Sequence, residues 1–457
     1  MGNELVVERR TALSVSAEAA WRWHAEPGWG AFERLAPPWR RVTMLERPPA
    51  LADGVRLTFR IACGPLGVRW VAEHREVRPA EGFVDFQLDG PFERWVHRHR
   101  FESWPDGTAV LYDRIACVLP LGLRLGAAAV EREVRRMLAY RHSLTSDELA
   151  MHAGTAHRPR LHIAITGASG LLGSALGPAL TAGGHRVTRI VRGTAGPGEI
   201  SWDPAAGRLA PADLLGVDAV IHLAAENIGA RWTPARKRRI LESRRDGTRL
   251  IAEAMARCAR PPATLVSVSA VGLYGDRGEE ILTETSAPGE GFLPEVARMW
   301  EAATQPAEAA GIRVVRPRLG VVITPRGSIL ERMLLPFRLG IGGRLGTGEQ
   351  WLSWISIDDV VGVLHRALFD DAMRGSFNAV APVPVRNREL TQVLARLLRR
   401  PALLPVPATA LKVVFGEMGE QAILGSTRAI PDRLSALGHP FRHRTVESAL
   451  SHLLGLR

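Results

Sequence analysis

The stretch Leu161-His162-Ile163-Ala164-Ile165-Thr166-Gly167-Ala168-Ser169-Gly170-Leu171-Leu172-Gly173 joins a short apolar run to a glycine-rich turn. An apolar segment suited to a helix follows, and Arg186 to Val191 then has the pattern of a second strand. Strand, glycine turn, helix and strand in this order predict a dinucleotide-binding βαβ unit. In such a unit Gly167 permits the tight turn, Gly170 lets the backbone approach a pyrophosphate, and Gly173 lets the helix pack closely on the strand.

The carboxyl ends of later strands are expected to complete this site. Strands are predicted at Val217 to Leu223, Thr264 to Val268 and Ile312 to Val322, and ligands of open α/β sheets bind beyond the carboxyl ends of their strands. The first helix contributes unpaired N–H groups and a partial positive charge. We therefore expect a doubly wound α/β Rossmann domain whose cofactor contacts are Thr166, Gly167, Ser169, Gly170, Leu171, Leu172, Gly173, Leu223, Ala224, Ala225, Glu226, Ser267 and Arg318.

Arg192 stands at the end of the second predicted strand, 19 residues beyond Gly173. Proteins that prefer NAD usually carry an acidic residue here, which binds the ribose hydroxyls. A guanidinium suits the additional 2′-phosphate of NADP instead, through charge-assisted contacts. NADP(H) is therefore favoured over NAD(H) as the cofactor, and an ordinary solvated arginine is the alternative interpretation.

Several short motifs after residue 160 stand in the order that one protein family shows. They are Ser201-Trp202-Asp203-Pro204, Ala225-Glu226-Asn227-Ile228, Arg231-Trp232-Thr233, Ser269-Ala270-Val271-Gly272, Pro336-Phe337-Arg338-Leu339-Gly340 and Trp351-Leu352-Ser353-Trp354-Ile355. Together with the glycine turn they resemble the extended short-chain dehydrogenase/reductases, and among these the atypical YfcH-like NAD(P)-dependent epimerase family. The resemblance covers residues 161–457 and implies a Rossmann core with a smaller C-terminal substrate region from about residue 385.

Residues 1–150 are mostly strand-like, with helices at both ends. Glu93 to Ser103 alternates so that Trp95, His97, His99 and Phe101 share one face. A last helix is expected from about Leu125 to His142, followed by a linker over residues 151–160. This order resembles the START-like or Bet v 1-like helix-grip fold (SRPBCC, polyketide cyclase-like), an α+β domain. Its aromatic residues either fill the core or line a ligand pocket, and both interpretations stay open.

The usual acid/base pair of the dehydrogenase superfamily, Tyr-x-x-x-Lys, is absent. The chain has three tyrosines and none is followed by lysine four residues later. In the helix expected to carry the pair, Leu293 and Ala297 occupy the two positions, and neither side chain transfers a proton. Ser269, Tyr274 and Lys237 are the candidate catalytic residues that remain, with Glu226 beside them on the rim.

Two functions fit this pattern. The first is an NADP(H)-dependent oxidoreductase or epimerase that acts on an unidentified small or hydrophobic substrate. The second is a dinucleotide-responsive regulatory protein without turnover, whose N-terminal cavity holds a lipid-like ligand. The sequence gives no indication of the oligomeric state.

Composition narrows the function classes. The net charge of the 457 residues is +12, but 57 of the 59 basic residues are arginine and they are scattered, so we expect no nucleic-acid partner. The distant Cys63, Cys117 and Cys258 suit a reducing cytoplasm, and no apolar signal segment or membrane span is evident. His97 and His99, with His74 on another strand, have no evident carboxylate beside them, so no metal site is expected.

Overall fold

The computed structural model describes residues 4–25, 30–46, 50–63 and 66–456. Contacts between Cα atoms divide the chain into two compact units. Unit 1 comprises Met1–Pro159, Pro178–His185 and His452–Arg457, and unit 2 comprises Arg160–Gly177 and Arg186–Ser451.

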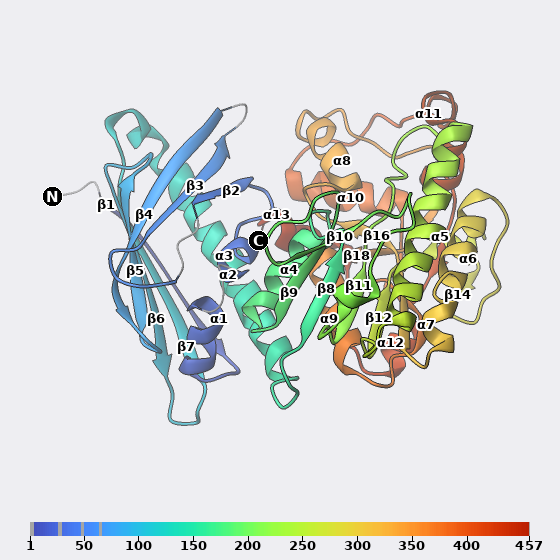
Figure 1. Ribbon diagram of the computed structural model, residues 1–457. Coiled ribbons are helices and arrows are strands. Elements are labelled where there is room, and N and C mark those ends of the chain that lie inside the picture. Colours follow the sequence, from blue (N-terminus) through green and yellow to red (C-terminus); the bar gives the residue numbers. More distant parts are fainter. Residues whose placement is uncertain (1–3, 26–29, 47–49, 64–65, 457) are drawn as a thin grey trace. The chain divides into compact units, whose positions relative to one another are not determined.

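Unit 1 contains an antiparallel sheet of seven strands in the order β1-β7-β6-β5-β4-β3-β2 (Figure 1). The strands are β1 (Glu4–Leu13), β2 (Val42–Glu46), β3 (Arg56–Cys63), β4 (Leu66–Arg78), β5 (Gly82–Asp89), β6 (Arg94–Ser103) and β7 (Ala109–Val118). The helical segments are α1 (Ala17–Ala25), α2 (Gly30–Arg34), η1 (Leu121–Gly126) and α3 (Ala127–Ala153). Two short helices inserted after the first strand and one long helix after the last confirm the helix-grip fold.

The buried face of this sheet is the one expected from the alternation in β6. Trp95, His97, His99 and Phe101 are all buried, whereas Arg94 and Arg100 on the opposite face are exposed. Trp95 packs edge-on against Trp70, with ring centroids 5.2 Å apart, and both belong to an apolar cluster that includes Leu138 of α3. A pocket lined by Leu35, Phe83 and His99, among others, measures about 40 Å³. Because that volume holds only one or two waters, this pocket is too small for a lipid-like ligand.

Helix α3 is longer than the sequence analysis predicts. It continues past His142 to Ala153, and so occupies the first residues of the expected linker. Leu144, Glu148 and His152 extend its buried face at four-residue spacing. His152 packs over Gly183, and its Nε2 lies 3.1 Å from the carbonyl oxygen of Ala179. The predicted helix end was wrong because the sequence after His142 contains no helix breaker before Gly154.

Unit 2 is built on a parallel sheet in the order β10-β9-β8-β11-β12-β15, extended by β13 and β19, which both pair with β15. Its strands are β8 (His162–Thr166), β9 (Arg186–Arg192), β10 (Glu199–Trp202), β11 (Ala219–His222), β12 (Thr264–Ser267), β13 (Ser269–Ala270), β15 (Arg313–Leu319) and β19 (Gly375–Ala379). From β8 the next strands, β9 and β10, are added on one side, and β11, β12 and β15 are then added on the other side, so the strand order reverses between β8 and β11. This order confirms the doubly wound Rossmann fold, whose switch point is the expected ligand crevice.

Helices and short ribbons complete this unit. The helical segments are α4 (Gly173–Ala182), η2 (Pro211–Leu214), α5 (Pro234–Arg257), η3 (Val271–Tyr274), α6 (Phe292–Ala302), α7 (Gln305–Ala309), α8 (Ile329–Arg338), α9 (Ile357–Phe369), α10 (Asn387–Leu398), α11 (Ala408–Phe415), η4 (Gly419–Ile423), α12 (Asp432–Ala436) and α13 (Val446–Leu454). The ends of α4, from Pro178, and of α13, from His452, are assigned to unit 1. The two-stranded ribbons pair β14 (Ile281–Leu282) with β21 (Arg428–Ala429), β16 (Val321–Ile323) with β18 (Trp354–Ser356), and β17 (Trp351–Leu352) with β20 (Val385–Arg386). Helices α5, α6 and α7 pack together, and α9 packs against β12 and β15 (Figure 1).

The C-terminal region contains helix α10, with Leu390 and Leu394 buried. Its first residue is Asn387, whose side chain accepts a hydrogen bond from the backbone of Leu345, 2.8 Å away. Arg386 precedes the helix with extended dihedral angles.

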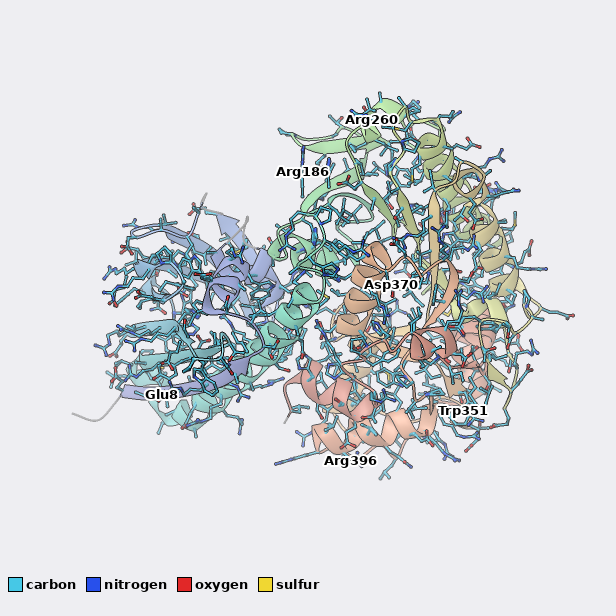
Figure 2. All side chains as sticks on the ribbon, turned by 90° about the horizontal axis from the view of Figure 1, so that it is seen from below. Glu8, Arg186, Arg260, Trp351, Asp370 and Arg396 are labelled. Carbon is cyan, nitrogen blue, oxygen red and sulfur yellow. The ribbon has the colours of Figure 1, made fainter. Side chains whose placement is uncertain are left out.

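Arg186, Arg260 and Arg396 are exposed and lie on different parts of unit 2 (Figure 2). No described helix is both long and apolar enough to cross a bilayer.

We expect the buried ion pair between Arg34 of α2 and Glu148 of α3 to be the main polar contact that holds α2 against α3. Their side chains are 6% and 0% exposed. Arg34→Ala leaves the Glu148 carboxylate buried without this cation, which should cost about 3–5 kcal/mol of unfolding free energy. Denaturant titration of the full chain measures the loss. Arg10→Ala, which breaks an exposed pair with Glu102, should change stability little; equal effects of both variants would contradict the assignment.

Candidate active site

The glycine turn lies against the end of the neighbouring strand β11. Gly167 has a φ of +67°, and a Cβ at this position would lie 2.9 Å from the backbone nitrogen of Ala224. A Cβ on Gly173 would lie 2.4 Å from the carbonyl oxygen of Gly167. Both distances are too short for a side chain, so the turn requires glycine at these two positions.

The Thr166 hydroxyl connects β8 to β11 at the switch point. It accepts hydrogen bonds from the backbone N–H groups of Leu223 (3.1 Å) and Ala224 (3.2 Å) and donates to Nδ1 of His222 (2.7 Å). Burial lowers the pKa of His222 to about 4, so this imidazole is neutral at pH 7. These three contacts engage the Thr166 hydroxyl, so this side chain positions the ends of the two strands.

Three backbone N–H groups remain open where α4 begins. In the part of the chain that the structure describes, those of Ser169, Leu171 and Leu172 have no hydrogen-bond partner, and these residues are exposed or half-buried. The Ser267 hydroxyl, at the end of β12, is buried and also lacks a partner. Open amides at a helix N-terminus bind phosphate, and an unsatisfied buried hydroxyl indicates a missing polar ligand. The residues of this crevice therefore fit a dinucleotide.

Arg192 ends β9 and is exposed. Among the described residues its guanidinium makes no hydrogen bond or ion pair. A depression of about 440 Å³ opens immediately after it, lined by Gly193, Thr194, Ser201, Trp202 and Asp203, among others. Strand β10 pairs with β9 and ends there, with Trp202 opposite Arg192. A cation without a protein partner thus stands beside a hollow at the carboxyl ends of two neighbouring strands.

Ser269 belongs to a second polar network, centred on Glu301 of α6. The Ser269 hydroxyl donates to Glu301 Oε1 (2.8 Å), and Arg318 contacts both Glu301 oxygens through Nε and Nη2 (2.8 and 2.9 Å). Ser376 donates to Oε2 (3.0 Å). Burial opposes ionisation of Glu301, but the Arg318 and serine contacts outweigh it and lower its pKa. Glu301 is therefore a carboxylate that holds the Ser269 hydroxyl in place.

Tyr274 joins this network from its buried side. The ring is 0% exposed, its hydroxyl donates to Asn378 Oδ1 (2.7 Å), and it accepts from Arg318 Nη1 (2.9 Å). Burial raises the pKa of Tyr274 despite the adjacent guanidinium. Because its proton is committed to Asn378, Tyr274 is a packing residue in this conformation rather than a proton donor. Arg318, expected as a cofactor contact, is likewise engaged by Glu301 and Tyr274.

Lys237 and Glu226 have partners outside this network. Lys237 forms an ion pair with Glu417, 2.9 Å from both carboxylate oxygens, and lies over the Phe292 ring. The backbone N–H of Glu226 donates to Ser243 (3.1 Å), and its carbonyl accepts from Arg244 (3.0 Å). The contacts of Lys237 are those of a structural residue that joins α5 to the segment after α11.

Sequence reasoning missed Glu301 as a site residue. Leu293, Ala297 and Glu301 recur every four residues on one face of α6, and a Cβ on Gly272 would lie 3.5 Å from Leu293. Glu301 is the one ionisable side chain of these three. The signal was present in that spacing, because the next helical turn after the missing lysine position carries an acid.

Family profiles match most of the chain. "NAD dependent epimerase/dehydratase family" matches residues 163–379, "Domain of unknown function (DUF1731)" matches residues 406–453, and "Polyketide cyclase / dehydrase and lipid transport" matches residues 13–181. These matches agree with the resemblances drawn from the motifs and from the order of elements.

Three relatives illustrate the similarity. An epimerase family protein of Mycobacterium bovis is 41% identical over 292 residues, which cover 64% of this chain and 96% of the relative. The nucleoside-diphosphate sugar epimerase from Corynebacterium glutamicum has a crystal structure that is 34% identical, with a TM-score of 0.81 over 98% of this chain and 90% of that one. Human epimerase family protein SDR39U1, crystallised with NADPH, is 34% identical, with a TM-score of 0.59 over 64% and 99% of the two chains.

The Glu301–Arg318 pair predicts a pH effect on stability. A carboxylate whose pKa is lowered in the folded state stabilises the fold above its ordinary value of 4.5, and this contribution disappears as pH falls through the folded value. Glu301→Gln should therefore unfold at lower temperature at pH 7 and show a shallower further loss below pH 4.5. Thermal unfolding measured across acidic pH tests this. Glu308→Gln, on a more exposed pair with Arg316, is the control and should follow the wild-type curve.

Proposed function

This chain belongs to the NAD dependent epimerase/dehydratase family, and from that premise we propose that unit 2 is an NADP(H)-dependent oxidoreductase or epimerase of a small molecule. The observation that carries the cofactor preference is Arg192, whose guanidinium has no described partner and stands beside the hollow after β9 and β10. The NADPH bound to human SDR39U1 supports the preference.

The cofactor is held, in this proposal, by backbone more than by side chains. The open N–H groups of Ser169, Leu171 and Leu172 bind the pyrophosphate, and Gly167, Gly170 and Gly173 give it room. Leu223, Ala224, Ala225 and Glu226 line the crevice at the end of β11, and the Ser267 hydroxyl donates to the ribose. Arg192 binds the 2′-phosphate through charge-assisted contacts. Once bound, the nicotinamide supplies hydride transfer.

Ser269 and Glu301 provide the proton route in place of the tyrosine and lysine of the superfamily. A substrate hydroxyl that donates to Ser269 Oγ passes its proton to that oxygen, while the Ser269 proton moves along the existing 2.8 Å contact to Glu301. Arg318 keeps Glu301 ionised and therefore ready to accept. In the reductive direction each proton moves the opposite way, after Glu301 has taken up a proton from solvent. Tyr274 and Lys237 have no proton-transfer role in this scheme.

A second candidate function is a dinucleotide-responsive protein that does not turn over a substrate. The observation that favours it is the replacement of the usual proton donors on α6 by Leu293 and Ala297. The pocket described in unit 1 is too small for a lipid-like ligand, at about 40 Å³, so the described residues do not add support to that part of the hypothesis. Cys117 and Cys258, which are free and buried, fit action in the reducing cytoplasm under either function.

Reversing the charge at Arg192 tests the cofactor preference. Arg192→Asp removes the 2′-phosphate partner and adds a ribose acceptor, so NADPH affinity should fall about 10- to 100-fold while NADH affinity stays equal or rises. Calorimetric titration with both nucleotides measures this. Arg186→Asp makes the same change at the opposite end of β9 and should leave both affinities unchanged. Equal affinity of the wild type for both nucleotides would refute the preference, and no binding of either would refute the function.

Substitution of Ser269 separates the two candidate functions. We expect the wild type to oxidise NADPH with members of a panel of aldehydes, ketones and quinones, followed by nucleotide absorbance. Ser269→Ala should lower kcat about 100-fold or more and leave NADPH affinity intact, and Glu301→Gln should shift the pH dependence of kcat. Tyr274→Phe should retain most activity. Saturable NADPH binding without oxidation of any panel member would favour the non-catalytic function.

A further inference from the structure

A buried cluster of histidine and aspartate side chains lies in unit 1, separate from the dinucleotide crevice. It spans four neighbouring strands, because the register places His74 of β4 opposite Asp85 of β5, Asp85 opposite His97 of β6, and His99 opposite Asp113 of β7. Residues directly opposite in an antiparallel pair point to the same face. All of these side chains therefore gather on the buried face, between the two apolar clusters of the domain.

From the sequence we expect no carboxylate beside these histidines, but in the structure Asp85 and Asp113 lie next to His99. His99 Nε2 lies 3.2 Å from Asp85 Oδ2, and His99 Nδ1 lies 2.9 Å from Asp113 Oδ1. The Asp113, His97 and His99 side chains are each at most 4% exposed, and Asp85 is 22% exposed. The prediction that this face has no metal site rested on missing carboxylates, and that premise is wrong.

We propose that Asp85, His97 and His99 bind a divalent first-row transition metal ion in unit 1. One ligand atom from each residue lies within 4.8 Å of the other two. Two imidazoles and one carboxylate form a ligand set used for zinc and for non-haem iron. Metal–ligand bonds of about 2.0–2.2 Å place neighbouring tetrahedral ligands about 3.3 Å apart, close to the 3.2 Å between His99 Nε2 and Asp85 Oδ2.

The surroundings of these three residues are those of a metal centre. Asp113 faces the second nitrogen of His99, and His74 Nδ1 lies 2.6 Å from the other oxygen of Asp85. Such outer contacts orient the ligands of metal sites. His97 Nε2 is buried and makes no hydrogen bond, although Asp113 Oδ2 is 3.5 Å away. This nitrogen is a polar atom for which the described structure supplies no adequate partner.

The small cavity of unit 1 leaves room for the rest of the coordination shell. Asp85 and His99 are among its lining residues, and its volume of about 40 Å³ accommodates one or two waters. Three protein ligands with a position left for water are the arrangement of catalytic metal sites, whereas structural zinc sites use four protein ligands. The site therefore fits an ion that retains exchangeable water.

The alternative occupant is a proton. Burial alone would lower the pKa of His99, but Asp113 and Asp85 outweigh it and raise the pKa to about 9. An imidazolium between two carboxylates would balance part of the buried charge without a metal. It leaves His97 Nε2 without a hydrogen bond, 3.5 Å from Asp113 Oδ2, whereas a metal ion could use this nitrogen as a ligand.

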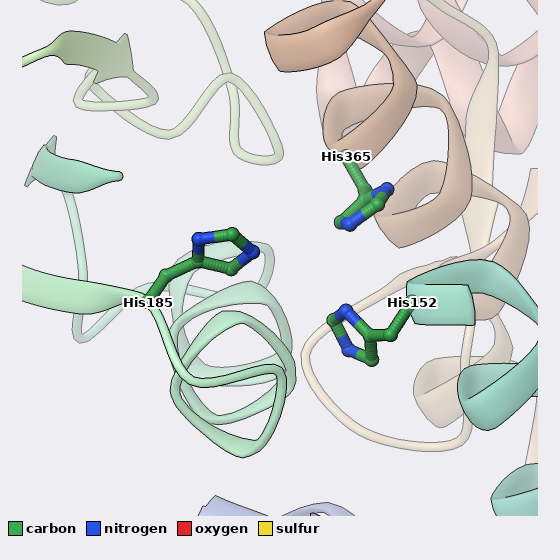
Figure 3. A group of neighbouring side chains, drawn as sticks. All are labelled: His152, His185 and His365. Carbon is green, nitrogen blue, oxygen red and sulfur yellow. The ribbon is translucent and has the colours of Figure 1, made fainter. Parts of the chain in front are cut away.

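Metal binding to the full chain distinguishes these occupants. Protein stripped with chelator and titrated calorimetrically with Zn²⁺ should bind one equivalent at this site. Asp85→Asn and His97→Gln should each weaken that binding at least 100-fold, and Asp113→Asn should weaken it about 10- to 100-fold. His152→Gln removes another buried imidazole of unit 1 (Figure 3) and should retain the equivalent. Circular dichroism confirms that each variant is folded.

Two results would overturn the proposal: no Zn²⁺ binding by the wild type, or binding that survives both Asp85→Asn and His97→Gln. X-ray absorption of the zinc-loaded wild type provides a test that does not depend on the folding of the variants. Two imidazole ligands with additional oxygen neighbours support the site, and any other imidazole count contradicts it. NADPH binding by unit 2 is independent of these outcomes.

Discussion

The close approach of the glycine turn to the end of β11 is the constraint on which the dinucleotide crevice depends. At Gly167 and Gly173 a side chain would collide with backbone atoms, so the turn can lie against β11 only with glycine at both positions. The Thr166 hydroxyl then holds the two strand ends together by taking up two backbone N–H groups of the β11 loop. The N–H groups of Ser169, Leu171 and Leu172, in the turn before α4, remain open to a phosphate.

The polar network around Glu301 also depends on a few side-chain contacts between distant segments. The superfamily places a phenol and an amine on this helix, and here apolar side chains take both positions. One carboxylate a turn later reaches Ser269 instead, and Arg318 keeps it ionised although burial favours the neutral acid. Because Arg318 also accompanies Tyr274, the phenol retained in the sequence serves the packing of the network.

Local features of the sequence predicted the fold and the cofactor crevice, whereas features that depend on strand register were missed. The glycine turn, the βαβ order and Arg192 at a strand end are each contained in one short segment. The Thr166 contacts, the pairing of Ser269 with Glu301 and the carboxylates beside His97 and His99 join distant segments. Asp85 and Asp113 became neighbours of these histidines only through the register of β5, β6 and β7, which a single sequence does not specify.

Both buried networks carry charges that a purely structural core would avoid. Replacing a buried ion pair by apolar side chains of similar volume is often neutral or stabilising, so Arg318 with Glu301, and His99 with its two aspartates, are not explained by stability. The two networks differ in what they leave unsatisfied. Every side-chain nitrogen of Arg318 has a protein partner. This is expected of a group that fixes Glu301, the carboxylate to which Ser269 donates. The cluster in unit 1 retains a buried imidazole nitrogen, His97 Nε2, that makes no hydrogen bond, and Asp85 and His99 of the same cluster line a small cavity. A bound ion would use such a nitrogen as a ligand, whereas apolar packing would have been the more stable arrangement had no ligand been involved.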